Sequence, residues 1–177
     1  IASSLVGSEM CIRDREPLPE ADYRKLRSSR TFMQGNGTLR QVHFALTDLR
    51  LHSQWTPELG ISPDAFRRRI AETTSVLPPI KEDRFLCSFG HIFAGGYAAG
   101  YYSYKWAEVL SADAFAAFEE VGLEQDDDVA ATGERFRNTI LSLGGSLRPA
   151  DVYRRFRGRD ATSAALIRHS GLAASAT

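Results

Sequence analysis

The sequence has little of several residue types whose abundance would define a class of protein. Its 177 residues include only two cysteines, Cys11 and Cys87, too few for a disulfide scaffold, so a reducing compartment is the default expectation. No apolar run approaches the roughly 18 residues that a membrane-spanning helix needs. Neither a G-x-x-x-x-G-K-[ST] phosphate loop nor a strand followed by G-x-G-x-x-G is present. Disulfide-rich, membrane-spanning and P-loop proteins are therefore not expected.

An excess of charge of either sign is also lacking. The 22 basic residues balance the 22 acidic ones, whereas a nucleic-acid-binding domain usually carries a clear positive excess. Only three of the basic residues are lysines, and arginine suits the recognition of carboxylates and phosphates. The hydrophobic fraction of 43% is ordinary for a globular protein. We therefore expect a folded chain without a nucleic-acid or membrane partner.

The first fifteen residues differ in character from the rest of the chain. Residues 1–15 show neither helical nor strand periodicity, and they lack the basic and apolar regions of a signal peptide. The string SLVGSEMCIRDR, from Ser4 to Arg15, resembles a peptide translated from library adapters in environmental sequence assemblies. We expect residues 1–15 to be a non-native, adapter-derived segment, with a genuine flexible N-terminal arm as the alternative.

From Glu16 onward the apolar residues recur with helical spacing, and no segment alternates as a strand would. Ser62 followed by Pro63 is typical of a helix N-terminus, and Gly158 of a helix end. The glycines of Gly35-Asn36-Gly37 are expected to break the chain between two helices. An all-α fold is therefore predicted, with helices at about residues 20–30, 39–52, 98–121 and 163–169, one from Pro63, one through Phe136 to Leu143, and one from Pro149 to Gly158.

The same patterns predict which side chains face inward. Leu39, Val42, Leu46 and Leu49 recur at spacings of three and four, which indicates one face of a helix. The segment 98–121 is apolar on nearly every side and is expected to be a buried helix. Phe66, Ile70 and Thr73 are expected to face inward, and Cys87 is expected to be buried. We expect a solvated face at Arg67–Arg69, rather than a surface for acidic ligands, and a solvated loop at Asp126–Asp128. Arg157 and Arg159 are expected to tie the last helices to the domain.

Tyrosine and glycine are concentrated between residues 90 and 104. Four of the six tyrosines and four of the fourteen glycines fall there. On a helix Tyr97, Tyr101 and Tyr104 share a face, so three phenols form a row of donors beside His91. Such donors can hold a peptide carbonyl or its developing oxyanion. Tyrosines at helical spacing are also common core residues, and the pattern alone leaves both interpretations open.

Longer stretches around this cluster form recognisable motifs. They are LRLH at 49–52, HIFAGGYAAGYYSY at 91–104 followed by KWAEVLSADAF, FRNTILSLGGS at 136–146, FRGR at 156–159 and LIRHSGL at 166–172. Together they closely resemble the C-terminal part of the thimet oligopeptidase and oligopeptidase A family of zinc metallopeptidases, and its oligopeptidase A branch most. The resemblance covers residues 16–172 and implies that residues 16–177 are the C-terminal part of an incomplete, zincin-like helical catalytic domain.

The resemblance also implies a function and a set of site residues. Members of that family are endopeptidases that admit only short, unstructured peptides, and a zinc ion is bound by an H-E-x-x-H helix and a downstream glutamate. A monomeric, cytoplasmic enzyme is implied, with organellar forms in the same family. The matching positions are His91, Tyr101 and Tyr104, which stabilise the oxyanion, and Tyr97 with Gly95, Gly96 and Gly100, which form the loop that contacts and closes over the peptide.

The metal-binding half of such a site is missing from this sequence. None of the four histidines stands in an H-E-x-x-H motif, so the zinc ligands are expected upstream of Glu16 and the chain alone is expected to be inactive. Asp48 and His52 would supply two ligands at most, and a helix-surface ion pair is the expected arrangement. The resemblance implies zinc-dependent hydrolysis of short peptides; a catalytically inert helical binding module is the alternative.

Overall fold

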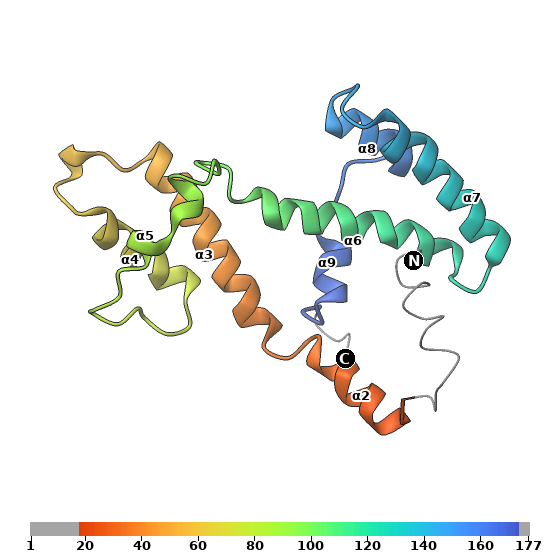
Figure 1. The fold of residues 1–177 in the computed structure, drawn as a ribbon, viewed down its shortest axis with the longest axis horizontal. Coiled ribbons are helices and arrows are strands. Elements are labelled where there is room, and N and C mark those ends of the chain that lie inside the picture. Colours follow the sequence, from red (N-terminus) through yellow and green to blue (C-terminus); the bar gives the residue numbers. More distant parts are fainter. Residues whose placement is uncertain (1–17, 174–177) are drawn as a thin grey trace. The chain divides into compact units, whose positions relative to one another are not determined.

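The computed structural model describes residues 18–173, whose regular structure is entirely helical (Figure 1). Phe32 ends the first of two compact units. The described part of this unit is dominated by α2 (Glu20–Ser29), which carries Glu20 and Asp22 in its first turn, where acidic side chains favour the helix dipole. The segment expected to be adapter-derived, residues 1–15, lies outside the described residues.

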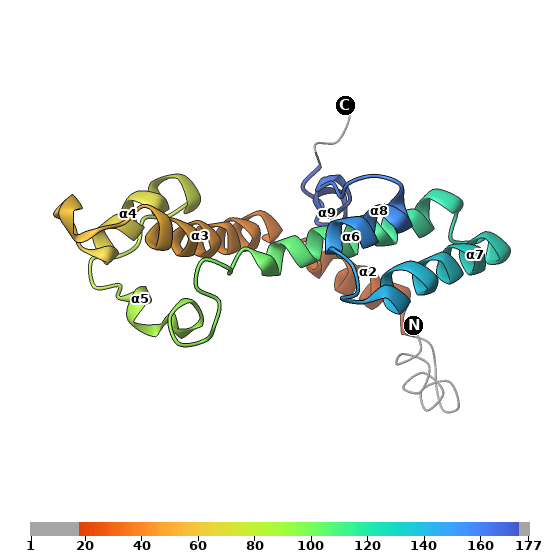
Figure 2. The same cartoon turned by 90° about the horizontal axis from the view of Figure 1, so that it is seen from above.

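The second unit contains the other helices, and it confirms the predicted all-α fold, since residues 18–173 include no β-strand. Contacts join α3 to α4, α6 to α9 and α7, and the η3 segment to α8, as Figures 1 and 2 show. In chain order the elements are α3 (Gln34–Ser53), η1 (Pro57–Leu59), α4 (Pro63–Thr74), α5 (Phe85–Ser88), η2 (Gly90–Ile92), α6 (Ser103–Val121), α7 (Asp126–Phe136), η3 (Arg137–Leu141), α8 (Pro149–Arg157) and α9 (Ala164–His169).

Several predicted helix ends are confirmed in atomic detail. The Ser62 hydroxyl accepts a hydrogen bond of 3.1 Å from the backbone N–H of Ala65, which satisfies one of the free donors at the start of α4. Gly158 follows α8 with φ +73°, a left-handed conformation that glycine adopts without strain. Local chemistry therefore determines these boundaries.

The start and the buried face of α3 differ from the prediction. The chain turns at Met33, whose φ is +52°, and the glycines at 35 and 37 lie inside the first turn of α3, where a glycine costs only about 1 kcal/mol. The buried residues of α3 are His43, Thr47 and Asp48, while Leu39 and Leu49 are exposed. A polar face is buried because its partners are polar: His43 Nδ1 lies 2.8 Å from the Thr74 hydroxyl of α4.

Helix α6 is also shorter and less buried than predicted. It begins at Ser103 rather than near residue 98, because residues 97–102 form turns. Its buried residues are Ala112, Asp113, Ala116 and Ala117, and of these Ala112 and Ala116 pack against Ala165 of α9. Trp106 and Phe115 remain 50% and 47% exposed. The apolar character of α6 therefore does not correspond to burial within this chain.

Four smaller expectations are wrong. Arg67 is 2% exposed rather than solvated, because Asp64 and Asp83 bind its guanidinium. Thr73 faces solvent while Thr74 is buried, and Cys87 is exposed. Asp126–Asp128 form the first turn of α7 instead of a loop, where they favour the helix dipole. Arg157 and Arg159 do tie α8 and its C-cap to α6, through Glu120 and Asp113.

Candidate functional site

The segment from Gly90 to Tyr102, called the glycine-rich loop below, carries most of the predicted site residues. It folds tightly because the Gly90 carbonyl accepts hydrogen bonds from three following N–H groups, those of Phe93, Ala94 and Gly95, at 2.9–3.1 Å. A Cβ atom on Gly95 would lie 2.8 Å from the Cα of His91, which is too close for any side chain. The loop conformation therefore requires glycine at position 95.

The other two predicted loop glycines differ in what they contribute. Gly96 has a φ of +80°, so any side chain there would be strained even though the space around it is open. Gly100 has an ordinary φ, and a Cβ atom would make ordinary contacts with the carbonyl oxygens of Tyr97 and Ala98, at 3.5 and 3.8 Å. Gly95 and Gly96 are thus required by the backbone, whereas the structure gives no steric reason for Gly100.

The structure brings Tyr97, Tyr101 and Tyr104 together, although only Tyr104 lies on a helix. The ring centroids of Tyr101 and Tyr104 are 5.0 Å apart, as are those of Tyr97 and Tyr104. The exposed imidazole of His91 lies 6.2 Å from the Tyr101 ring and 6.3 Å from the Tyr97 ring. Turns in the glycine-rich loop, rather than one helical face, assemble this tyrosine cluster.

Three phenylalanines support the cluster from below. Phe44 of α3 stacks on Phe85 of α5 with ring centroids 4.7 Å apart, and Phe89 lies 4.7 Å from Phe85. Tyr101 meets Phe89 and Phe44 edge to face, at 5.1 and 5.9 Å. Such contacts fix the plane of an aromatic ring as well as burying it, so Tyr101 has a defined orientation.

The surroundings of Tyr101 and Tyr104 raise the pKa of both phenols. The Tyr101 hydroxyl donates to Oε1 of Gln41 at 3.2 Å, and burial raises the pKa of Tyr101. Hydrogen bonding with the hydroxyl of Tyr97, followed by burial, raises the pKa of Tyr104 to about 12. Both groups therefore remain protonated, and able to donate, at any pH near neutrality.

Sequence reasoning missed the residue that holds the loop in place. The side chain of Asp48, on α3, is completely buried and accepts hydrogen bonds from the backbone N–H groups of Ala99 and Tyr101, both at 2.9 Å. His52 Nδ1 lies 2.9 Å from the Asp48 carboxylate, so the expected pair exists, although its carboxylate is not on the helix surface. In the sequence, the signal for Asp48 is a carboxylate that stands next to the apolar positions of an amphipathic helix.

No cluster of metal-ligating side chains is found among the described residues. Residues 18–173 contain no group of three or more His, Cys, Asp and Glu side chains placed to ligate one, and the Asp48 oxygens are occupied by backbone donors. No helix in the same part of the chain is long and apolar enough to cross a membrane.

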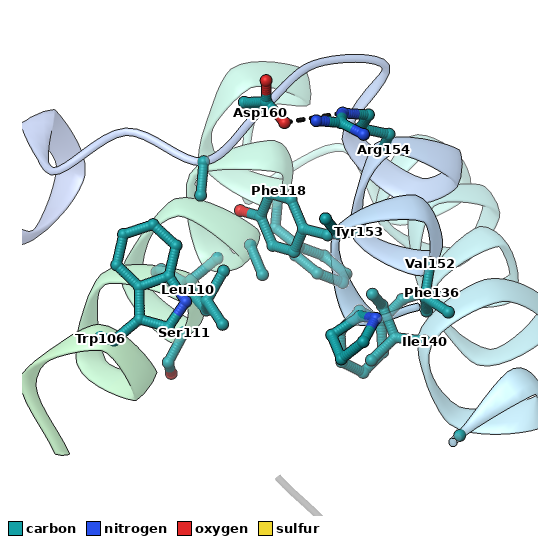
Figure 3. A pocket seen from close by; sticks show the side chains of 16 residues that line it. Trp106, Leu110, Ser111, Phe118, Phe136, Ile140, Val152, Tyr153, Arg154 and Asp160 are labelled. Carbon is teal, nitrogen blue, oxygen red and sulfur yellow. Dashed lines mark hydrogen bonds and ion pairs between the residues drawn. The ribbon is translucent and has the colours of Figure 1, made fainter. Parts of the chain in front are cut away.

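A second feature is an open apolar cavity of about 760 Å³ bounded by α6 on one side and η3 and α8 on the other (Figure 3). Trp106 and Leu110 project from α6 toward Ile140 and Val152 on the facing elements, and the ion pair between Arg154 and Asp160 lies at one rim. The lining residues of α6 include Trp106 and Leu110, which the sequence predicted to be buried in that helix.

Comparison with known proteins assigns the chain to a family. Residues 10–172 match Peptidase family M3. The organellar oligopeptidase A, chloroplastic/mitochondrial, of Arabidopsis thaliana is 57% identical over 159 residues, which are 90% of this chain and 20% of that protein. The probable cytosolic oligopeptidase A of the same plant is 56% identical over 159 residues, 90% of this chain and 23% of that protein. Oligopeptidase A of Escherichia coli (strain K12) is 43% identical over 157 residues, 89% and 22% of the two chains.

The chain therefore belongs to Peptidase family M3. It spans about a fifth of the length of these curated relatives. The resemblance inferred from the motifs around the tyrosine cluster is confirmed at the level of the family, and the roles of the individual site residues remain predictions.

Proposed function

We propose that this chain forms the C-terminal, oxyanion-stabilising side of the catalytic site in a zinc-dependent endopeptidase that hydrolyses short peptides. The observation that carries the proposal is the tyrosine cluster: the rings of Tyr97 and Tyr101 each lie 5.0 Å, centroid to centroid, from the ring of Tyr104, beside a loop that needs glycine. The three relatives named above are called oligopeptidases, which supports short peptides as the substrate class.

Zinc, when bound by the rest of the protein, would polarise the scissile carbonyl and activate water. Its ligands are assigned to a part of the protein outside this chain, because residues 18–173 supply no suitable group. The tyrosines of this chain are assigned a separate task, which is to donate hydrogen bonds to the carbonyl oxygen of the substrate as negative charge develops on it.

The existing partners of the phenols give a reason for such a donor to act mainly in the transition state. Tyr101 donates to the neutral amide oxygen of Gln41, and a neutral peptide carbonyl is an acceptor of similar strength. An oxygen that carries negative charge is a much stronger acceptor. Exchanging Gln41 for the substrate therefore gains free energy only as the reaction proceeds, which is the condition for raising kcat rather than lowering KM.

His91 and the glycine-rich loop complete the assignment. The imidazole of His91 is exposed beside Tyr97 and Tyr101, where it can contact the substrate next to the scissile bond. Tyr97, Gly95, Gly96 and Gly100 lie on the loop that would close over the peptide backbone. We place the enzyme in the cytoplasm as a monomer; the names of its plant relatives include both cytosolic and organellar forms.

The test is the substitution Tyr104→Phe in the full-length protein that contains this chain. We expect kcat on a short peptide to fall by about 100-fold, the typical effect of losing one oxyanion donor, with a smaller change in KM. Tyr102→Phe is the matched control, because Tyr102 is exposed on the same segment and has no place in the cluster. Equal kcat/KM values for Tyr104→Phe and the unmodified protein would remove Tyr104 from the mechanism, and absence of any zinc-dependent peptidase activity would favour an inert binding module.

A further inference from the structure

We propose that Asp48 is a positioning residue that holds the glycine-rich loop in the conformation that aligns Tyr101 and Tyr104. The inference rests on the function proposed above for the tyrosine cluster, and it adds a residue on a different element, α3. Asp48 acts through the loop backbone and is not assigned any contact with the substrate.

The geometry of the carboxylate is that of a two-point anchor. Oδ1 accepts the N–H of Ala99 and Oδ2 accepts the N–H of Tyr101, each at 2.9 Å. Neither N–H donates to a backbone carbonyl in the described part of the chain. Two hydrogen bonds to one planar group fix both the position and the direction of the backbone between them, and bonds to an ionised acceptor are the stronger kind.

The backbone between these two donors is in a conformation that needs support. Ala99 has a φ of +56°, in the left-handed region that alanine rarely adopts because its Cβ atom approaches the carbonyl oxygen. Glycine would adopt it without strain, yet the chain has alanine here. A strained residue persists only where the surroundings hold it, and the Asp48 carboxylate is the group that binds its N–H.

The α3 side of the anchor is itself rigid. The Asp48 side chain is completely buried, and His52 Nδ1 lies 2.9 Å from Oδ1 of that carboxylate and 2.8 Å from the Asp48 backbone oxygen. Gln41 lies on the same helix, about one turn before Phe44, and its side-chain oxygen accepts a hydrogen bond from the Tyr101 hydroxyl. Helix α3 thus binds Tyr101 at both its backbone and its hydroxyl, and a shift of the loop would move this phenol.

The experiment compares Asp48→Asn with Asp113→Asn in the full-length protein. Asp113 is a matched control because it is equally buried but accepts hydrogen bonds from Tyr153 and Arg159, away from the loop. Hydrogen exchange of the loop is measured first. The amide side chain of asparagine keeps one acceptor oxygen, so we expect exchange at Ala99 and Tyr101 to become about tenfold faster or more in Asp48→Asn, and to stay unchanged in Asp113→Asn.

Kinetics then separate positioning from general stability. We expect Asp48→Asn to lower kcat by about tenfold or more with a smaller change in KM, and Asp113→Asn to leave kcat within twofold while lowering the thermal midpoint. The double variant Asp48→Asn/Tyr101→Phe should be little worse than Tyr101→Phe alone, because residues that act through one another are not additive.

Each arm has a result that overturns the proposal. Unchanged loop exchange in Asp48→Asn, an equal fall of kcat in Asp113→Asn, or additive effects with Tyr101→Phe would each do so. If Asp48→Asn does not fold, Asp48→Glu keeps both oxygens but moves them by one methylene, and the same fall in kcat is expected. Should Tyr104→Phe alone leave kcat unchanged, the proposed function fails, while the exchange measurement still decides whether Asp48 holds the loop.

Discussion

The carboxylate of Asp48 accepts a hydrogen bond of 2.9 Å from the backbone N–H of Tyr101, although 53 residues separate them in the sequence. This contact joins the first long helix of the second unit to the loop that carries the tyrosines. It places Tyr101 against Phe44 of α3 and Phe89, which follows α5, and brings its hydroxyl to Gln41.

Gly95→Ala is expected to disturb the site, whereas Gly90→Ala is not. A Cβ atom at Gly95 would meet the His91 backbone at 2.8 Å, while the space at Gly90 is open. Displacing His91 and the following tyrosines should lower kcat/KM by about 10- to 100-fold. Steady-state kinetics of the two variants in the full-length protein make the comparison, and similar activities would show that the loop conformation does not matter for catalysis.

Gln41→Glu should impair catalysis more than Gln41→Met does. An ionised glutamate would bind the Tyr101 proton about as strongly as a developing oxyanion, so the donor would gain nothing by changing partner. The stronger bond to a charged acceptor corresponds to about a tenfold fall in kcat. Methionine removes the oxygen without supplying a charge. Equal kcat values for the two variants would argue that Tyr101 donates nothing to the substrate.

Tyr97→Phe is expected to lower the pKa of Tyr104. Hydrogen bonding with Tyr97 is the largest cause of the raised pKa, which is about 12, and without it the value should return toward the ordinary 10. Absorbance titration of Tyr97→Phe, with the Tyr97→Phe/Tyr104→Phe variant subtracted, isolates the Tyr104 phenolate. A pKa that stays near 12 would mean that Tyr97 does not interact with Tyr104 as the structure indicates.

The acid stability of the helical unit should depend on Asp113. Hydrogen bonds from Arg159, and from Tyr153, lower the pKa of Asp113 to about 2 against the opposing effect of burial. A carboxylate with a lowered pKa stabilises the fold fully above the unfolded value, near 3.8, and this contribution is lost as the pH falls through about 2. Thermal midpoints between pH 5 and pH 2 should therefore fall more steeply in the unmodified protein than in Asp113→Asn.

Arg159→Ala provides a second measure of the same network. It leaves a buried acceptor with one partner fewer, and since Arg159 is itself 41% exposed the free energy of unfolding should fall by about 1 kcal/mol. Arg154→Ala is the control, because Arg154 pairs with Asp151 and Asp160 in solvent, where ion pairs contribute little. Equal losses in the two variants would contradict a special role for the buried carboxylate.

Signals that act over a few residues were predictable from the sequence. Ser62 with Pro63 marked the start of α4, and Gly158 marked the end of α8, because a cap depends on the residues next to it. The crowding of tyrosine and glycine pointed to the candidate site for a related reason, since all of these residues lie within one short segment. The motifs around this segment predicted the family of the chain, and the comparison confirmed that family.

Features that depend on contacts between distant segments were not predictable in the same way. The polar face of α3 is buried because Thr74 and the loop backbone supply partners for His43 and Asp48, and periodicity counts only apolar residues. Arg67 was assigned to solvent since its second carboxylate, Asp83, lies sixteen residues away. The exposed apolar residues of α6 that line the cavity show the converse. Their pattern correctly predicted a helix, but it contained no information on what covers them.

The central claim is that Tyr104 binds the transition state more tightly than the substrate. The most direct measurement is the inhibition constant of a phosphinic peptide, a tetrahedral analogue of the reacting peptide, with and without Tyr104→Phe in the full-length protein. We predict that the substitution weakens the analogue by about the same factor as it lowers kcat/KM, near 100-fold, while the binding of a ground-state peptide changes little. Undiminished affinity for the analogue in a variant with reduced kcat would contradict the account.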